Sequence, residues 1–280
     1  MRFEEEWVRD LGQKKGLVSL SAPFIARLLA EALKDHSQAQ EKLVKTKSWS
    51  EFARSKECEA VSKEVRSRLR EVYGVFWSNQ KREALLKSLI QNPFEEAHDK
   101  ILALHTSTKE RLPYYEEVYE KIFAITGKPK KILDLACGLN PIAYPYLDCK
   151  PEYLANELCE SDAFFIQSFF DGLKIQGQAF AFNVLQFSKT PFADFLRCDV
   201  CFLFKALDSL EAIDWGFSEK LLSNIPTTWL VVSFPTRSLG GKKEIKQSKR
   251  SWFEHVLGKN HWAYQTFELP NEFFYVVKKT

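Results

Sequence analysis

The first hundred residues carry apolar side chains at intervals of three and four positions. This spacing recurs in residues 22–35, 49–56, 60–77 and 81–91, where it places the apolar side chains on one face of an α-helix. Asn92 and Pro93 then form a helix stop, and a further amphipathic stretch continues to the turn at Gly127. The pattern predicts an all-helical N-terminal domain over residues 1–100.

From residue 131 the pattern changes to short apolar runs separated by helical stretches. The strand candidates are residues 131–136, 152–158, 179–187, 198–207, 228–235 and 272–279, and the helix candidates between them include residues 160–174 and 215–225. Strands that alternate with helices form a mostly parallel sheet covered by helices. We therefore expect an α/β domain over residues 101–280.

Composition is typical of a globular protein. Hydrophobic residues make up 45% of the 280 positions, and no apolar run reaches the ~18 residues of a membrane span. The first residues are acidic where a signal peptide requires a basic start. We expect a cytoplasmic monomer with no membrane partner.

The cysteines are scattered through apolar segments, which favours free thiols. Cys198 and Cys201 have the spacing of a metal-binding or redox pair. No second cysteine or histidine pair lies nearby, so the alternative is that both thiols belong to the core. We expect no metal site.

The stretch KKILDLACGLNPIAYPYL, residues 130–147, contains a short loop after the first strand candidate. In a parallel sheet this loop is where the backbone approaches a bound cofactor. Its single glycine, Gly138, makes it poorly suited to a pyrophosphate. S-adenosylmethionine contains no phosphate and removes this requirement, with Asp134 at the end of the first strand and Glu157 placed to hold the ribose. The alternative is that Asp134 caps the turn and Glu157 is a surface charge.

Three motifs occur in a fixed order along the chain. They are HTSTKER at residues 105–111, GLNP at residues 138–141 and SFPTRSLGG at residues 233–241. Together they resemble the aminoglycoside-resistance 16S rRNA methyltransferases, which methylate N7 of guanine 1405 in the decoding site. The resemblance extends from about residue 60 to the C-terminus. It implies a Rossmann-like class I S-adenosylmethionine-dependent methyltransferase domain, preceded by an all-helical rRNA-binding domain, and a substrate that is the 16S rRNA of the 30S ribosomal subunit.

The resemblance also implies which residues bind S-adenosyl-L-methionine. Arg111 is expected to hold the cofactor carboxylate through a charge-assisted pair. For this segment the alternative is a helix N-cap formed by Ser107 or Thr108. The full expected set is His105, Thr106, Ser107, Arg111, Ala136, Gly138, Glu157, Asn183, Val184 and Phe204.

Two positions in this set depart from the family pattern, and a third has a structural alternative. Glu157 stands where the family has aspartate, and Asn183 stands where the family has an acid near the adenine. Asparagine can still accept a hydrogen bond from the adenine amine. Phe204 matches a position that flanks the adenine, although it is equally well explained as an ordinary strand aromatic.

The expected reaction requires no general base. Guanine N7 carries a lone pair at neutral pH, so catalysis rests on proximity, orientation and the stabilisation of charge. The base must leave the stack to be reached. A carboxylate can accept from guanine N1 and N2, and the alternative role for Glu272 is a strand residue satisfied by backbone amides. The catalytic candidates are Lys205, Ser233, Arg237 and Glu272.

The net charge is only +3, so contact with RNA must come from local basic clusters. One cluster lies in the helical region and the other in a basic loop at residues 236–251. Solvated charge is the alternative, but an rRNA partner favours phosphate contact. The RNA-binding candidates are Lys63, Arg66, Arg68, Arg70, Lys81, Arg82, Lys242 and Lys243.

The sequence is compatible with two other functions. A catalytically weakened methyltransferase-fold protein acting as an rRNA-binding or ribosome-assembly factor is the main alternative, and its support is the pair of departures at Glu157 and Asn183. A small-molecule methyltransferase is disfavoured by the basic clusters and by the long helical region.

Overall fold

The computed structural model describes residues 3–13, 22–69, 82–92, 95–189, 196–237, 244–245 and 250–279. The chain divides into two compact units, Met1–Trp77 and Ser78–Thr280. The division falls earlier than the boundary predicted at residue 100. The reason is that α6 (Arg82–Gln91) packs against α10 (Glu160–Gly172), and α7 (Glu95–Leu102) packs against the 3₁₀ helix η3 (Asn140–Tyr146), so both helices belong to the second unit.

The first unit is helical, as the spacing of its apolar residues predicts. Trp7 is fully buried, lies edge-on to Phe52 with ring centroids 5.0 Å apart, and donates its indole N–H to Ser62 at 2.8 Å. A buried indole with a polar partner loses no hydrogen bond on folding. The helices are α1 (Glu4–Gly12), α2 (Ala22–Lys34), α3 (Ser37–Lys45), α4 (Trp49–Phe52) and α5 (Lys56–Leu69).

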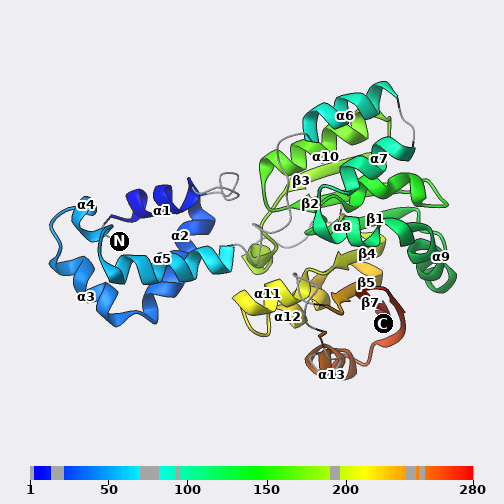
Figure 1. Cartoon of the computed structure of the whole chain (residues 1–280). Helices are drawn as coiled ribbons and strands as arrows, with labels where there is room; N and C mark the ends of the chain where they lie inside the picture. The colour runs from blue at the N-terminus through cyan, green and yellow to red at the C-terminus, as the bar shows by residue number, and fades with distance from the viewer. Residues whose placement is uncertain are drawn as a thin grey trace. The chain divides into compact units, whose positions relative to one another are not determined.

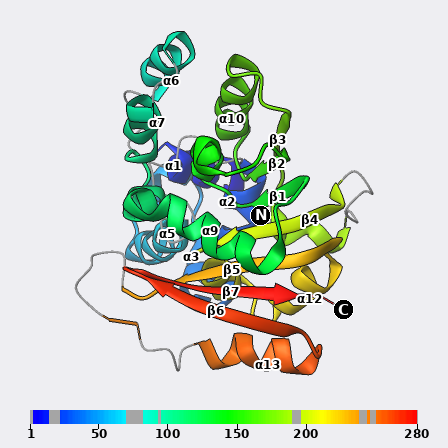
Figure 2. The same ribbon diagram turned by 90° about the vertical axis from the view of Figure 1, so that its right-hand side faces the viewer.

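The second unit is built around a sheet of seven strands in the order β3-β2-β1-β4-β5-β7-β6 (Figures 1 and 2). Strands β1 to β5 pair in parallel, whereas β7 runs antiparallel to both β5 and β6. The strands are β1 (Lys131–Leu135), β2 (Glu152–Glu157), β3 (Gly177–Ala181), β4 (Cys198–Phe204), β5 (Thr227–Pro235), β6 (Ala263–Leu269) and β7 (Glu272–Lys278). The predicted α/β class is confirmed.

Helices pack against this sheet at several places, as Figure 1 shows. Contacts join α10 to β2 and β3, α9 to β7, and α11 to β5. The remaining helical elements are α8 (Thr106–Arg111), η2 (Leu112–Tyr114), α9 (Tyr115–Thr126), η4 (Val184–Lys189), α11 (Leu207–Ile213), α12 (Phe217–Asn224) and α13 (Ser251–Lys259). None of the helices described here is long and apolar enough to cross a membrane.

The strand order reverses between β1 and β4. In open parallel sheets, ligands bind in the crevice at this reversal, beyond the carboxyl ends of the strands. The crevice is bordered here by the residues that follow Leu135 and Phe204. Because β7 starts at Glu272 and pairs this residue with Pro235, the last residue of β5, the antiparallel strand brings a carboxylate to the same edge of the sheet.

Three elements differ from the sequence-based expectation. The strand predicted at residues 179–187 ends at Ala181 and is followed by η4, and the single amphipathic stretch before Gly127 is broken into α7, α8 and α9. Strand β6 was not predicted. Its residues from Ala263 to Glu268 are largely exposed on the edge of the sheet, so it lacks the apolar run of an inner strand.

The cysteine pair with CxxC spacing lies within the core. Cys198 and Cys201 both belong to β4 and are buried, and burial raises the pKa of each thiol. A thiol held neutral in this way is a poor metal ligand and a poor nucleophile. Throughout the described ranges, no group of three or more His, Cys, Asp or Glu residues is arranged to hold a metal ion.

Candidate active site

The loops after β1 and β4 hold three residues with positive φ. The angles are 51° at Ala136, 57° at Gly138 and 55° at Lys205. A non-glycine residue in this region costs about 1–3 kcal/mol and persists where the surrounding structure fixes it. Ala136 follows β1 and Lys205 follows β4, so strained residues of the kind that cluster at ligand sites lie on both sides of the strand reversal.

Gly138 lies directly against the imidazole ring of His105. A Cβ atom at this glycine would lie 3.0 Å from Cε1 and Nε2 of the ring, closer than nearly all real contacts. Burial lowers the pKa of His105 to about 3, and the positive charges of Arg111 and Lys205 add to the shift, so the ring is neutral. The structure thus brings together two of the residues predicted to bind the cofactor.

The carboxylate of Glu157 is buried beside the loop after β1. One oxygen accepts the N–H of Gly138 at 2.5 Å, and the other accepts the N–H of Leu158 at 3.0 Å. A carboxylate has about four lone-pair sites, so two acceptor positions remain for hydroxyl groups such as those of a ribose. The alternative of a surface charge is wrong, because Glu157 is only 7% exposed.

The burial of Glu157 predicts a pH dependence of stability. Burial, followed by the charge of Asp162, raises the pKa of Glu157 from 4.5 to about 7. The folded chain therefore binds more protons than the unfolded chain between these values, and the free energy of unfolding falls as the pH rises through them. Glu157→Gln does not titrate, so its stability relative to the wild type should improve by about 2–3 kcal/mol between pH 4.5 and 7.

Urea unfolding of both proteins at pH 5 and pH 7.5 measures this difference. The interpretation fails if the stability gap between Glu157→Gln and the wild type is the same at the two pH values. A constant offset from the amide itself does not affect the comparison, because only the change with pH is attributed to the buried charge.

Asp134 is fully buried at the end of β1. Its Oδ2 accepts hydrogen bonds from Asn140 Nδ2 at 2.8 Å and from the Tyr153 hydroxyl at 2.7 Å. Its Oδ1 has no hydrogen-bond partner among the described residues. Burial raises the pKa of Asp134 to about 6, against the effect of the two hydrogen bonds. A buried acceptor left open in this way fits a donor supplied by a ligand, above all a charged ammonium group.

Arg111 is buried and paired with Glu272. The guanidinium Nη2 donates to Glu272 Oε1 at 2.6 Å and Nε donates to Oε2 at 3.1 Å, while the guanidinium carbon lies 4.6 Å from the centre of the Phe204 ring. Burial lowers the pKa of Arg111, but the charge of Glu272 outweighs this and raises it. This pair is bidentate, the strongest geometry available to an arginine.

Arg111 makes three further hydrogen bonds to side chains that the structure describes. Nη1 donates to Asn140 Oδ1 at 3.1 Å and to the Tyr115 hydroxyl at 3.5 Å, and Nη2 donates to Ser107 Oγ at 3.4 Å. The bonds to Tyr115 and Ser107 are at the long limit of hydrogen bonding and are weak, whereas the bond to Asn140 is of ordinary length. The two long bonds are the ones that a ligand carboxylate could replace at least cost.

The carboxylate of Glu272 is engaged by other side chains of the protein. It is only 3% exposed, and besides Arg111 its carboxylate accepts the Ser233 hydroxyl at 2.5 Å and lies 3.6 Å from Lys205 Nζ. An acceptor engaged by three partners has little capacity left to read guanine N1 and N2. These contacts favour the positioning of Arg111 over the predicted reading of the guanine base. The alternative of a residue satisfied by backbone amides is also incorrect, because its partners are side chains.

Lys205 is held at the same edge of the sheet. Its Nζ donates to Glu110 Oε2 at 2.7 Å, and its backbone N–H bonds to the Ser233 hydroxyl at 3.0 Å. The side chain is 9% exposed, so the ammonium lies at the border of the buried network. Ser233 therefore fixes both the backbone of Lys205 and the carboxylate of Glu272, and these three catalytic candidates form one connected group.

The other residues predicted to bind the cofactor include Asn183, Val184 and Thr106. Asn183 Oδ1 accepts the N–H of Leu185 at 3.0 Å, which leaves its amide N–H₂ and one acceptor site for a ligand. Val184 is buried and Thr106 is half-buried as the first residue of α8. The predicted N-cap is wrong, because His105 is the N-cap residue without a side-chain cap and the Thr108 hydroxyl donates to the carbonyls of Leu102 and His105.

The RNA-binding candidates divide into exposed and engaged side chains. On α5, Lys63 is exposed, Arg66 is half-buried and Arg68 is paired with Glu64 at 2.5 Å. Arg237, which was predicted as a catalytic residue, is exposed after β5 and is thus accessible to a phosphate. Arg70, Lys81, Lys242 and Lys243 lie outside the described residues.

Arg82 does not fit the predicted phosphate contact. Its guanidinium bonds to Asp162 at 2.5 Å and lies 5.2 Å from the centre of the Phe165 ring, with 11% of the side chain exposed. A guanidinium committed to a buried carboxylate is a structural pair that joins α6 to α10.

Sequence reasoning missed the residues that connect this network. Asn140 donates to Asp134 through its amide nitrogen and accepts from Arg111 through its amide oxygen. The Tyr153 hydroxyl donates to Asp134, and the Tyr115 hydroxyl donates to Asn140. Asn140 belongs to the GLNP motif, so its position was recognised without its role. Glu110 was likewise part of HTSTKER, and only the fold places it beside Lys205.

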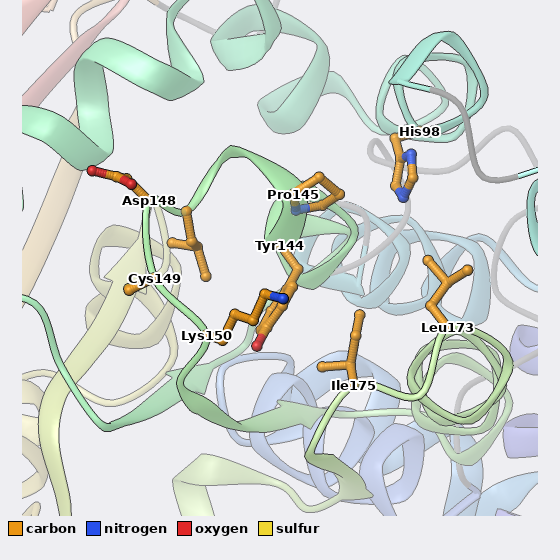
Figure 3. Close-up of a pocket in the computed structure, with 9 residues that line it drawn as sticks. His98, Tyr144, Pro145, Asp148, Cys149, Lys150, Leu173 and Ile175 are labelled. Atoms are coloured by element: carbon orange, nitrogen blue, oxygen red, sulfur yellow. The ribbon is translucent and has the colours of Figure 1, made fainter.

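A cavity lies near the amino ends of β2 and β3. It measures about 620 Å³ and is formed by η3, the segment before β2 and the turn before β3. In Figure 3 the side chains of Tyr144 and Lys150 lie between Cys149 on one side and Ile175 and Leu173 on the other. Because its walls precede the strands, this cavity is distinct from the crevice beyond the carboxyl ends of β1 and β4.

Comparison with known proteins identifies the family. Residues 39–276 match the family model described as ribosomal RNA methyltransferase (FmrO). The 16S rRNA (guanine(1405)-N(7))-methyltransferase of Frankia casuarinae is 30% identical over 239 residues, which cover 81% of this chain and 82% of that protein. The Serratia marcescens protein of the same name is 30% identical over 230 residues, which cover 82% of this chain and 87% of that protein.

The solved structures agree with the sequence comparison. The crystal structure of the 16S rRNA methyltransferase RmtF, in complex with S-adenosyl-L-homocysteine, is similar over 100% of this chain and 99% of that one, with a TM-score of 0.81 and 26% identity. Together with the buried polar network at the reversal of a methyltransferase-like sheet, these matches show that the chain belongs to the ribosomal RNA methyltransferase (FmrO) family.

Proposed function

We propose that the protein transfers a methyl group from S-adenosyl-L-methionine to N7 of guanine 1405 in 16S rRNA. The observation that carries the proposal is the match to relatives of that name over about four-fifths of both chains. The polar crevice at the carboxyl ends of β1 and β4 supports it, because it lies where a parallel sheet binds its ligand. Modification of this guanine gives resistance to aminoglycosides that bind the decoding site.

The residues of the crevice fit S-adenosyl-L-methionine. The open Oδ1 of Asp134 suits the ammonium of its methionine part, Arg111 suits the carboxylate, and Glu157 suits the ribose hydroxyls. Gly138 lets the backbone approach closely without a side chain in the way. When bound, the cofactor supplies a methyl group already activated by the sulfonium.

The chain's own residues provide orientation rather than proton transfer. Guanine N7 is an unprotonated lone pair, so no side chain has to remove a proton from it. Glu272 holds Arg111, Ser233 holds Glu272 and the backbone of Lys205, and Glu110 holds the Lys205 ammonium. These contacts hold the side chains of Arg111 and Lys205 in fixed orientations. Fixed orientation of the reacting groups is the main source of rate gain in a transfer that needs no general base.

Docking on RNA is assigned to basic side chains outside the crevice. Lys63 and Arg66 lie three residues apart on α5 of the helical unit, and Arg237 lies just beyond β5. Exposed cations contact phosphates and set the position of a protein on RNA without reading sequence. We propose that the helical unit docks on the rRNA of the assembled 30S subunit and that the enzyme acts as a monomer in the cytoplasm.

Expression in a susceptible bacterium tests the proposal. Nucleosides from the 16S rRNA of expressing cells should contain N7-methylguanine, and the cells should grow at aminoglycoside concentrations that stop the empty-vector strain. Calorimetry with S-adenosyl-L-methionine separates the enzyme from a methyltransferase-fold assembly factor, because only the enzyme has to bind the cofactor. Unmodified rRNA from cells that contain folded, cofactor-binding protein would rule out the proposed reaction.

A further inference from the structure

A cavity of about 380 Å³ lies between the turn that joins α11 to α12 and the first half of α13, elements labelled in the lower part of Figure 1. Its lining includes two tryptophans and two glutamates. The eight lining residues are Glu211, Trp215, Gly216, Glu219, Ser251, Trp252, His255 and Val256. None of them belongs to the network around Arg111, so the cavity is separate from that network.

The turn that forms one wall is fixed by Glu211. One oxygen of this carboxylate accepts the N–H of Gly216 and the other accepts the N–H of Ser218, each at 2.7 Å. Gly216 has φ 81°, a conformation that side chains rarely adopt. The result is a tightly held turn that leaves Trp215 79% exposed at the rim of the cavity.

The charge of the cavity is negative. Glu211 is 7% exposed and, among the residues that the structure describes, forms no ion pair. Glu219 is paired with Lys259 at 2.7 Å, and neither lysine nor arginine lines the cavity. A phosphate group would therefore enter against the charge of Glu211, which only two backbone N–H groups stabilise, whereas a cation would be attracted by it.

We propose that this cavity binds the cationic side chain of an arginine or lysine in a basic protein segment. The face of an indole ring attracts a guanidinium or ammonium group, and tryptophan is the most effective of the aromatic side chains in this role. The buried carboxylate of Glu211 supplies the complementary charge. A basic segment of a protein in a ribonucleoprotein particle is one such partner if the substrate is the particle proposed above, but the binding itself does not depend on that proposal.

Peptide titration of the full chain tests this site. The probes are a capped tetra-arginine peptide, a capped tetra-citrulline peptide of the same shape without charge, and a single-stranded oligouridine, each followed by calorimetry. Wild-type protein should bind the arginine peptide and not the citrulline peptide. Trp215→Ala should weaken binding about tenfold, and Trp215→Phe should fall between the two, because a phenyl ring attracts cations less than an indole.

Phe164→Ala is the matched control, because Phe164 is 74% exposed on α10 and lies outside the cavity. It should bind the arginine peptide as the wild type does, and Trp215→Ala should leave oligouridine binding unchanged. Equal binding of the arginine peptide to Trp215→Ala and the wild type, or no binding at all, overturns the proposal. Weaker oligouridine binding by Trp215→Ala overturns it as well, and assigns the exposed indole to base stacking. Methyl transfer is not the readout, so failure here is distinct from failure of the proposed reaction.

Discussion

Arg111→Ala is expected to abolish methyl transfer and to lower the free energy of unfolding by about 3–5 kcal/mol. The substitution leaves the carboxylate of Glu272, which is 3% exposed, without its bidentate partner in the core. Lys205 Nζ, at 3.6 Å, compensates the remaining charge only in part, and a poorly compensated buried charge is among the largest single costs in protein stability. The loss of activity has a separate cause, because Arg111 is also the side chain that suits the carboxylate of the cofactor.

A double variant separates the two effects. In Arg111→Ala/Glu272→Gln the buried charge is gone, and the amide oxygen can still accept the Ser233 hydroxyl, so urea unfolding should show a recovery of most of the lost stability. Methylation should stay absent. Arg27→Ala is the matched control, because Arg27 forms a half-exposed pair with Glu31 on α2 and its removal should cost little. Restored methylation in the double variant would show that Arg111 serves the fold alone.

Asp134→Asn is expected to weaken the binding of S-adenosyl-L-methionine about 10- to 100-fold while leaving the fold intact. The amide oxygen can keep the hydrogen bonds from Asn140 and Tyr153, but its N–H₂ then occupies the place of the open acceptor. The site loses a charge-assisted bond of ~1.5–3 kcal/mol, and every 1.4 kcal/mol is about tenfold in affinity. Calorimetry with the cofactor measures the change.

Asp134→Asn should also change how the free energy of unfolding depends on pH. Burial raises the pKa of Asp134 from 3.8 to about 6, so the wild type loses free energy of unfolding as the pH rises between these values, whereas asparagine does not titrate. The stability of the variant relative to the wild type should therefore improve as the pH rises from 3.8 to about 6, whatever constant offset the amide adds. Asp148→Asn is the matched control, since that side chain is 90% exposed. Unchanged affinity in Asp134→Asn would remove Asp134 from the cofactor site.

The α/β class followed from the sequence because inner strands and helices have different apolar periods. The runs in β1, β4 and β5 are continuous because both faces of these strands are covered. Strand β6 was not predicted because its residues from Ala263 to Glu268 are largely exposed and form no apolar run. The strand is defined by its pairing with β7. Antiparallel closure of the sheet is a long-range property that no local pattern contains.

Motif order identified the crevice residues but not their connections. Arg111 and Glu272 are separated by 161 positions, and only the antiparallel β7 brings them together, so the carboxylate was assigned to the substrate rather than to the arginine. Asn140 is a similar case, because its bridge between Asp134 and Arg111 requires three segments to meet. Local motifs name such residues, whereas roles that arise from tertiary contact need the fold.

Purified 30S subunits incubated with the protein and methyl-labelled S-adenosyl-L-methionine provide the most direct test. Reduction followed by aniline cleaves an RNA chain at N7-methylguanine, so primer extension locates each modified position. The account predicts a single new cleavage at guanine 1405 of the 16S rRNA, which is absent with Arg111→Ala/Glu272→Gln. Label incorporated at another nucleotide, or none incorporated by protein that binds the cofactor, would contradict it.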